Sequence, residues 1–311
     1  MAANNTGHTT NGANGVTSVE PRLARLPRTS MPQEVLTVLL RDGGLILEQI
    51  ADHEDIDKAV EEIQPHLLGQ ARHDGVTMPK ESKQVSGLAG KSRTFATKLL
   101  ANSLFQEVSN LLLSKTTTTY YGKQKQTSVS RPQVTNTMAF WIGPGAQAQG
   151  LHRDDQCHHT RHPAKYETEL GMMFAATRSH KANGATRVVP GSNKWDDQRK
   201  PRLDEAASAE LEKGDALMWL GSTYHGAGQN TTSDEYRLLF AGFMTPGWCR
   251  QDENQYLAYS FEDIKDYPED VQKLLGYYVS RPYGGFVEQM EPLEFLKCNG
   301  DWTKWRPGDL V

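Results

Sequence analysis

The chain has 311 residues, 37% of them hydrophobic, and a formal net charge of −4, so it can form a large domain with a buried core and offers no basic surface for nucleic acid. No apolar run approaches the roughly 18 residues of a membrane span, and the N-terminus carries no basic-then-apolar targeting signal. The three cysteines, Cys157, Cys249 and Cys298, suggest no disulfide framework, so we expect a cytoplasmic protein.

The first third of the chain predicts a tail followed by helices. Residues 1–30 are rich in Asn, Thr and Gly, which predicts a disordered tail. Residues 68–92 lack periodicity and predict a mobile loop. The strongest helical pattern is at residues 94–114, where Leu99, Leu104, Val108 and Leu112 share one side. The remaining patterns predict a helix, a strand and a helix, at residues 32–43, 45–50 and 53–67.

From about residue 117 the pattern changes to short segments rich in β-branched and aromatic residues, separated by Gly, Pro and Asn. Such segments are typical of an antiparallel sandwich or barrel. After Tyr256 a helical or irregular cap is expected, so residues 31–311 form one mainly β (α+β) domain. The expected strands are at residues 134–143, 150–156, 169–178, 185–192, 215–221, 222–230 and 236–244.

One expected strand carries a pair of metal-ligating residues. His152 and Asp154 are two positions apart, and alternate residues of a strand point to the same face. A third ligand, His225, comes from a distant segment. Two histidines and one carboxylate that leave positions open on the metal are typical of iron(II) sites that bind dioxygen. The alternative is that this short motif occurs by chance.

Arg237 follows His225 by 12 positions (237 − 225) and shares a strand face with Leu239, Ala241 and Phe243. A guanidinium inside a small barrel needs a partner, because burying an unpaired charge is costly. A dicarboxylate co-substrate would supply one through two parallel charge-assisted hydrogen bonds. The alternative is a surface salt bridge with Asp234 or Glu235.

Three motifs in this order resemble one known family. They are QGLHRDD at 149–155, preceded by Pro144–Gly145, then NGATRVVPGSN at 183–193, and EKGDALMWLGSTYHGAGQN at 212–230. Together with Arg237 they resemble the phytanoyl-CoA hydroxylase-like branch of the iron(II)/2-oxoglutarate-dependent dioxygenases, in particular its fungal secondary-metabolite members. The likeness covers about residues 35–290.

The resemblance implies a double-stranded β-helix, the jelly roll of cupin-like proteins, flanked by helices. It implies that His152, Asp154 and His225 hold iron(II), with 2-oxoglutarate and O2 as co-substrates. Arg237 would bind the distal carboxylate of 2-oxoglutarate, assisted by Thr186 and Gln149. The retained carboxylate ligand argues against a halogenase, in which a small residue frees a site for halide. Where the family often has His at the end of the second motif, this chain has Asn193 at a turn position.

The resemblance also implies the reaction class. A C–H bond of a bulky apolar natural product would be oxidised, with release of succinate and CO2. Hydroxylation, desaturation, epoxidation, rearrangement and endoperoxide formation are not separated by the sequence. A non-catalytic jelly-roll binding protein and a zinc hydrolase on a cupin-like barrel remain as alternatives. The candidate substrate contacts are Met138, Phe140, Met172 and Phe174 in an apolar pocket, with Tyr224 and Trp248 at its entrance.

Two further features are left over. Cys157, His158, His159 and His162 could bind zinc, but they lack the paired spacing of structural zinc motifs; His158 or His159 could instead contact the substrate. The segment after Tyr256 and the C-terminal CNGDWTKWRPGDLV, with two tryptophans, suggest a surface that needs a partner. We therefore expect a homodimer that acts on a small molecule.

Overall fold

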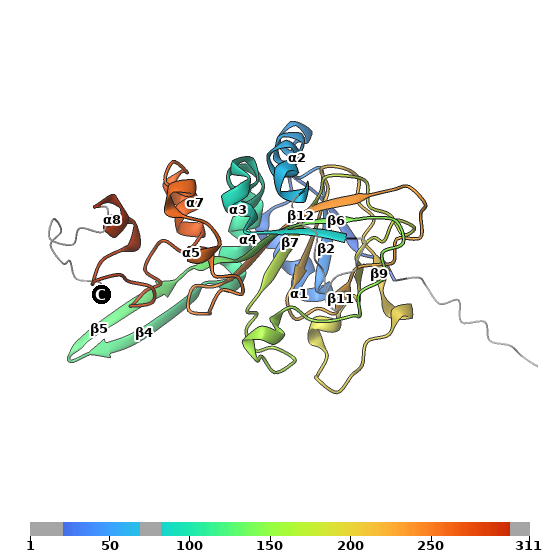
Figure 1. The fold of residues 1–311 in the computed structure, drawn as a ribbon. Coiled ribbons are helices and arrows are strands. Elements are labelled where there is room, and N and C mark those ends of the chain that lie inside the picture. The colour runs from blue at the N-terminus through green and yellow to red at the C-terminus, as the bar shows by residue number, and fades with distance from the viewer. Residues whose placement is uncertain (1–20, 69–81, 299–311) are drawn as a thin grey trace, which may run out of the picture.

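The computed structural model describes residues 21–68 and 82–298, and its core is a large sheet with a smaller sheet beside it (Figure 1). The large sheet has the order β1-β2-β10-β7-β12-β6-β3, and the small sheet has the order β11-β8-β9. Neighbouring strands are antiparallel except β1 and β2. The strands of the large sheet are β1 (Ala24–Pro27), β2 (Gly44–Glu48), β3 (Ser82–Ser86), β6 (Pro132–Ile142), β7 (Leu170–Ala175), β10 (Ala216–Leu220) and β12 (Arg237–Pro246).

The remaining strands form the small sheet and a separate two-stranded ribbon. The small sheet consists of β8 (Arg187–Val188), β9 (Ala207–Ser208) and β11 (His225–Gly226). The ribbon consists of β4 (Lys115–Tyr121) and β5 (Gln124–Ser130), and it projects from the body of the molecule beside α8 (Figure 1).

Helices cover one face of the large sheet. Phe240 and Met244 of β12 and Met172 and Phe174 of β7 point to this face and join the main hydrophobic core with the helices. The N-terminal helical part contains α1 (Pro32–Asp42), α2 (His53–Leu68), α3 (Leu88–Lys91), the π-helix η1 (Phe95–Leu100) and α4 (Ser103–Leu113). The C-terminal cap contains α5 (Gln255–Ala258), α6 (Phe261–Ile264), α7 (Glu269–Leu274) and α8 (Pro292–Lys297).

Alternate residues of the same strands point to the opposite face. Leu239, Ala241 and Phe243 of β12 form a second apolar cluster there with Trp219 of β10. This face looks onto the small sheet, and the two sheets enclose a cavity. The jelly-roll core flanked by helices, expected from the resemblance, is therefore confirmed. No helix of the described residues is both long and apolar enough to cross a membrane.

Three local predictions in the N-terminal part were wrong. Ala24–Pro27, which we assigned to the disordered tail, form β1 because they pair with β2 and because Arg25 binds Glu48 and Asp215; residues 1–20 of that tail lie outside the described residues. Part of the expected loop at 68–92 forms β3 and α3, and residues 69–81 are not described. The expected helix at 94–114 is two helices, because the Asn102 side chain accepts a hydrogen bond from the Phe105 N–H and starts a new one.

Candidate metal and co-substrate site

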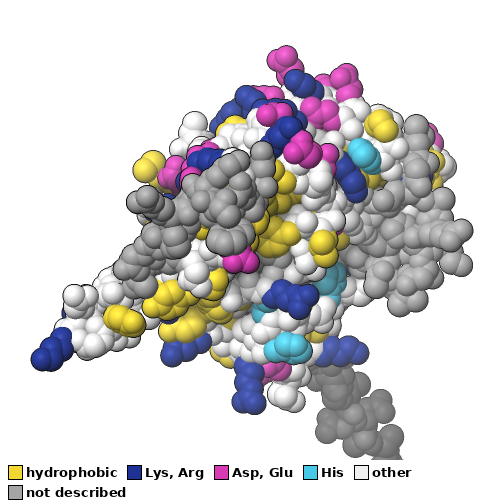
Figure 2. Space-filling model, turned by 60° about the vertical axis from the view of Figure 1, so that its left-hand side comes forward, with side chains coloured by type: hydrophobic (Ala, Val, Ile, Leu, Met, Phe, Trp, Pro, Cys, Tyr) yellow, Lys and Arg dark blue, Asp and Glu magenta, His cyan; other side chains and the backbone are white. Residues whose placement is uncertain are grey.

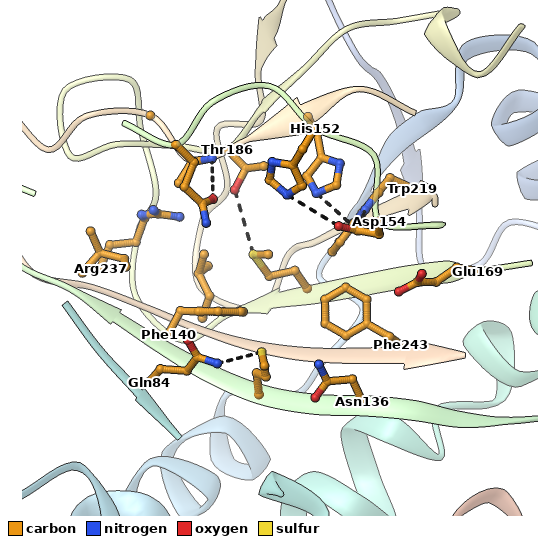
Figure 3. Close-up of a pocket in the computed structure, with 18 of the residues that line it drawn as sticks. Gln84, Asn136, Phe140, His152, Asp154, Glu169, Thr186, Trp219, Arg237 and Phe243 are labelled. Atoms are coloured by element: carbon orange, nitrogen blue, oxygen red, sulfur yellow. Dashed lines mark hydrogen bonds and ion pairs between the residues drawn. The ribbon is translucent and has the colours of Figure 1, made fainter. Parts of the chain in front are cut away.

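The cavity between the two sheets has a volume of about 490 Å³. Its apolar wall comes from β6 and β12, through residues such as Met138, Phe140, Leu239 and Phe243. Figure 3 shows Arg237 and Thr186 at one end and Glu169 at the other, with His152 and Asp154 along one side. A cavity of this size, with a few polar groups in an apolar lining, is typical of a small-molecule site.

His152, Asp154 and His225 lie together in this cavity and form the two-histidine, one-carboxylate triad. The Nε2 of His152 is 3.6 Å from Asp154 Oδ1, and the Nε2 of His225 is 3.3 Å from Asp154 Oδ2. The three possible ligand atoms lie within 4.8 Å of one another. Donor atoms at this spacing can meet at one metal ion.

The local backbone around the triad differs from the expected strand. His152 forms only an isolated bridge with His225, in which each N–H donates to the other residue's carbonyl oxygen at 2.9 Å. Asp154 has a helical backbone and leads into the short 3₁₀ helix η2 (Asp155–His158). Gly226 allows the segment around Gly150 to approach β11 closely, because a Cβ at position 226 would lie 2.8 Å from the carbonyl oxygen of Gly150. The triad is therefore formed by a bridge and a turn, and the prediction of a strand at 150–156 was wrong.

Hydrogen bonds orient all three triad side chains. The Nδ1 of His152 lies 2.8 Å from the Gly150 carbonyl oxygen, and the Nδ1 of His225 lies 3.1 Å from that of Thr223. These carbonyl oxygens accept a hydrogen bond from Nδ1–H, so each Nε2 keeps its lone pair for a metal. Trp219 Nε1 donates to Asp154 Oδ2 at 2.9 Å. Burial lowers the pKa of His225, which favours the neutral imidazole that metals bind. The donor set therefore fits iron(II).

Arg237 is 1% exposed at the start of β12 and lines the same cavity. In the described part of the chain it has no ion pair, and its Nε has no hydrogen-bond partner. Glu235 instead pairs with His180, so the alternative of a surface salt bridge is wrong. Burial lowers the pKa of Arg237 to about 10. A buried cation that faces a cavity and has no ion-pair partner among the described residues is suited to bind an anion.

Thr186 and Gln149 also line the cavity. Thr186 is buried, and among the described residues its hydroxyl has only a distant sulfur contact, to Met173 at 4.0 Å. Gln149 Oε1 accepts a hydrogen bond from the Ala227 N–H at 3.0 Å. Both side chains thus share one cavity with Arg237.

Only some of the expected substrate contacts line the cavity. Met138 and Phe140 do, but Met172 and Phe174 point to the other face of β7 and are buried in the main core. Both faces of β7 are apolar, so its sequence does not show which residues point to the cavity. In the structure Met173 lines the cavity, in place of Met172 and Phe174.

The two residues expected at the entrance lie elsewhere. Tyr224 packs against Trp195 and under the guanidinium of Arg153. Trp248 is 54% exposed and lines separate surface hollows. The prediction of an entrance formed by these two residues was therefore wrong.

The residues of the cysteine and histidine cluster are not brought to one point. Cys157 and His158 form a group with Asp252 in which the possible ligand atoms lie within 4.8 Å of one another, whereas His159 is exposed and does not belong to this group. His162 lies 2.9 Å from Asp155 and 2.7 Å from Asp197 in a separate ion-pair network.

Several cavity residues were missed by the sequence analysis. They are Glu169 and Met173 from the β7 segment, Asn136 from β6, Trp219 from β10, Gln84 from β3, and Asp252. The one available signal was Glu169, a carboxylate directly before an apolar strand and four positions from Met173. Alternation along the strand places both on one face.

Comparisons with known proteins agree with this geometry. Residues 39–238 match the family model described as "Phytanoyl-CoA dioxygenase (PhyH)". "Dioxygenase swnH1" of Metarhizium robertsii is 35% identical over 88% of this chain and 92% of the relative. "Dioxygenase cnsJ" of Penicillium expansum is 35% identical over 86% of this chain and 82% of the relative.

Solved structures share the fold. The 2-oxoglutarate-dependent carbocyclase SnoK from nogalamycin biosynthesis superposes with a TM-score of 0.53 at 13% identity, over 75% of this chain and 92% of that one. The epimerase SnoN of the same pathway gives 0.51 at 17% identity, over 69% and 82% of the two chains. The chain belongs to the phytanoyl-CoA dioxygenase (PhyH) family of iron(II)- and 2-oxoglutarate-dependent dioxygenases.

Proposed function

We propose that His152, Asp154 and His225 hold iron(II), and that Arg237 binds the C5 carboxylate of 2-oxoglutarate with help from Thr186 and Gln149. The enzyme would use iron(II) and 2-oxoglutarate to oxidise a C–H bond of a natural product with a bulky apolar body. The observation that carries the proposal is Arg237, a buried cation without an acidic partner, in the same cavity as the triad. Neither a zinc hydrolase nor a non-catalytic jelly roll needs such a residue.

When bound, iron(II) supplies the redox chemistry that couples the oxidation of 2-oxoglutarate to succinate and CO2 with oxidation of the substrate by O2. The protein contributes orientation and exclusion of water. The hydrogen bond from Trp219 holds the Asp154 carboxylate, and the backbone carbonyls hold the two imidazoles. The Arg237 guanidinium can bind a carboxylate through two parallel hydrogen bonds, which fixes the co-substrate's position and direction.

The apolar walls support a substrate with an apolar body. Met138 and Phe140 of β6 face Leu239 and Phe243 of β12 across neighbouring strands of one cavity wall. Which oxidation follows depends on where these side chains hold the target carbon, since about 1 Å of misplacement changes rates strongly. The fungal dioxygenases among the relatives support a role in secondary-metabolite biosynthesis.

The central test is aerobic incubation with iron(II), 2-oxoglutarate, ascorbate and a panel of fungal intermediates, followed by mass spectrometry. We expect a product with added oxygen or lost hydrogen, and one succinate for each oxidation. Activity under anaerobic conditions with zinc would instead support the hydrolase. Binding of small molecules without any succinate formation would support the non-catalytic protein.

A homodimer remains part of the proposal. Tyr120 and Tyr121 are exposed on the projecting β4–β5 ribbon, and Trp248 and Tyr283 are exposed beside its base. Figure 2 shows hydrophobic side chains gathered on this face. Exposed aromatic patches are common at protein contacts. Light scattering at micromolar concentration should give the mass of two chains, and a mass of one chain would contradict the dimer.

A further inference from the structure

The two ends of the cavity differ in charge once the co-substrate is assigned. The two positive charges of iron(II) are matched by Asp154 and by one carboxylate of 2-oxoglutarate, and Arg237 matches the other carboxylate. The co-substrate end is therefore neutral overall. The other charged residues that line the cavity, within the described chain, are Glu169 and Asp252. Both are acidic, and no lysine or arginine of the described lining lies at this end; His158, whose Nε2 is 3.8 Å from Asp252 Oδ1, is the basic side chain beside Asp252.

Glu169, at the end of the cavity opposite Arg237, is a buried carboxylate. It is 2% exposed, its Oε2 has no hydrogen-bond partner in the described structure, and its carboxylate points into the cavity near Phe243 (Figure 3). Buried carboxylates are normally paired or hydrogen-bonded, because an isolated one is costly. A buried acceptor without a partner, on the wall of a binding cavity, indicates that the ligand supplies the donor.

The position of Glu169 is firmly held by the fold. Its carbonyl oxygen accepts a hydrogen bond from the Gly221 N–H at 2.8 Å. A Cβ at Gly221 would lie 2.6 Å from the Cβ of Glu169, so the two segments pack closely and fix the backbone from which the side chain reaches the cavity. A rigidly placed carboxylate is suited to recognise a ligand rather than to relax onto a protein partner.

Two further acceptors lie at the same end. Asn136 of β6 lines the cavity, and its Oδ1 is buried without a hydrogen-bond partner in the described residues. Asp252 lies at the rim, where the Cys157 thiol donates to it at 3.2 Å. The described lining contains no lysine and no arginine other than Arg237. This end can therefore accept several hydrogen bonds and supplies no positive charge of its own.

We propose that the substrate carries a basic nitrogen, and that Glu169 binds it as a protonated amine while the apolar walls hold the rest of the molecule. The inference rests on the proposed function, because it uses the assignment of Arg237 to 2-oxoglutarate. An ammonium group brings both the missing charge and the missing donors, and a charge-assisted hydrogen bond is about twice as strong as a neutral one. Glu169 is thus a specificity-determining residue.

The competing interpretation is a protonated Glu169 that donates to a neutral carbonyl group of the substrate. Burial, with Asp154 and Asp252 adding to it, raises the pKa of Glu169 well above its usual value. A carboxylic acid could then act as a donor. The unpaired acceptor of Asn136 and the acidic Asp252 favour the amine, because a carbonyl group would satisfy neither of them.

The test uses paired probes on the protein loaded with Mn(II) and 2-oxoglutarate. The pairs are 1-adamantanamine with 1-adamantanol, and decahydroquinoline with decahydro-2-naphthol; 2-adamantanone probes the carbonyl interpretation. Calorimetry should show each amine binding at least about tenfold more tightly than its alcohol, as one charge-assisted hydrogen bond in a dry site provides. Glu169→Gln should abolish this preference without weakening 2-oxoglutarate binding.

Glu167→Gln is the matched control. Glu167 is a partly buried carboxylate two residues away, and its Oε2 also has no hydrogen-bond partner in the described structure. Its Oε1 accepts a hydrogen bond from Ser222, and the residue does not line the cavity. This variant should keep the amine preference. A melting temperature of Glu169→Gln equal to or above that of the wild type would show that the variant is folded.

The outcomes separate the two proposals. Amines that bind no better than alcohols, a preference that survives Glu169→Gln, or tighter binding of the ketone would each overturn the amine proposal and leave the dioxygenase intact. Failure of the wild-type protein to bind 2-oxoglutarate in the presence of Mn(II) would contradict the proposed function instead.

Discussion

Replacement of Arg237 by lysine tests the co-substrate site most directly. The pKa of the guanidinium falls from an ordinary 12.5 to about 10 because burial removes its solvent. At 1.36 kcal/mol per pKa unit, this is a cost of about 3 kcal/mol for keeping the charge buried without an ion-pair partner among the described residues. A bound carboxylate would recover that cost, which is why Arg237 should contribute strongly to 2-oxoglutarate affinity.

Lysine keeps the charge but lacks the planar fork, so one of the two parallel hydrogen bonds is lost. Losing a charge-assisted hydrogen bond in a dry site costs about 1.5–3 kcal/mol, which weakens affinity roughly ten- to hundredfold. Arg237→Ala should be worse, because the C5 carboxylate would be desolvated and unpaired. The half-saturating concentration of 2-oxoglutarate should rise well before the maximal rate falls.

The assay titrates 2-oxoglutarate against succinate formation, and calorimetry with Mn(II) gives the affinity without turnover. Arg178→Lys is the control, because Arg178 is an exposed arginine paired with Glu212 on the surface. Exposed pairs contribute about 0–1 kcal/mol, so this variant should match the wild type. An unchanged half-saturation point in Arg237→Lys would place Arg237 outside the co-substrate site and refute the reasoning.

Three further predictions test the metal site and the cavity wall. Alanine at any one of the three triad positions should abolish iron-dependent succinate formation while the melting temperature stays near that of the wild type; near-normal turnover in two of the three variants would exclude the metal assignment. Trp219→Phe removes the donor to Asp154 and should weaken metal affinity about 10–100-fold in a metal titration, and an unchanged affinity would show that this hydrogen bond does not support the ligand. Phe174→Ala should lower the free energy of unfolding by about 3–5 kcal/mol, because Phe174 is buried in the main core. Phe140→Ala should chiefly change the KM for the substrate. If denaturant titrations and kinetics instead showed that Phe140→Ala loses stability and Phe174→Ala changes KM, the assignment of Phe140 to the cavity and Phe174 to the core would be contradicted.

The metal and co-substrate residues could be predicted from the sequence because their chemistry stands out from its surroundings. His152 and Asp154 interrupt a glycine-rich segment, and Arg237 is the one charged residue of β12, which is otherwise apolar or neutral. Side chains alternate between the two faces of a strand, so the position of one polar residue shows which residues share its face. Arg237 thus indicated that Leu239, Ala241 and Phe243 lie on the cavity face of β12. The short β-patterned segments of the core likewise indicated an antiparallel sandwich or barrel, and the resemblance carried by the three motifs implied the jelly roll.

What the sequence left open was decided by contacts between distant segments. Strand β7 is buried on both faces, so only its position between β10 and β12 shows that Met173 faces the cavity and Phe174 the helices. The four residues of β1 are too few to show a strand pattern in the sequence. They form a strand because they pair with β2 at the edge of the large sheet. The triad is held by a backbone bridge between residues 73 positions apart (225 − 152), which local periodicity does not describe.

Glu169 shows the same division most clearly. Its sequence context, a carboxylate before an apolar strand, is equally typical of an exposed strand end. Only the packing against Gly221 and the enclosure by two sheets bury Glu169 and leave its Oε2 without a hydrogen-bond partner among the described residues. The residue types that can do the chemistry are thus fixed by composition and spacing, whereas burial and missing partners are properties of the folded chain, because they depend on which distant segments meet around a side chain.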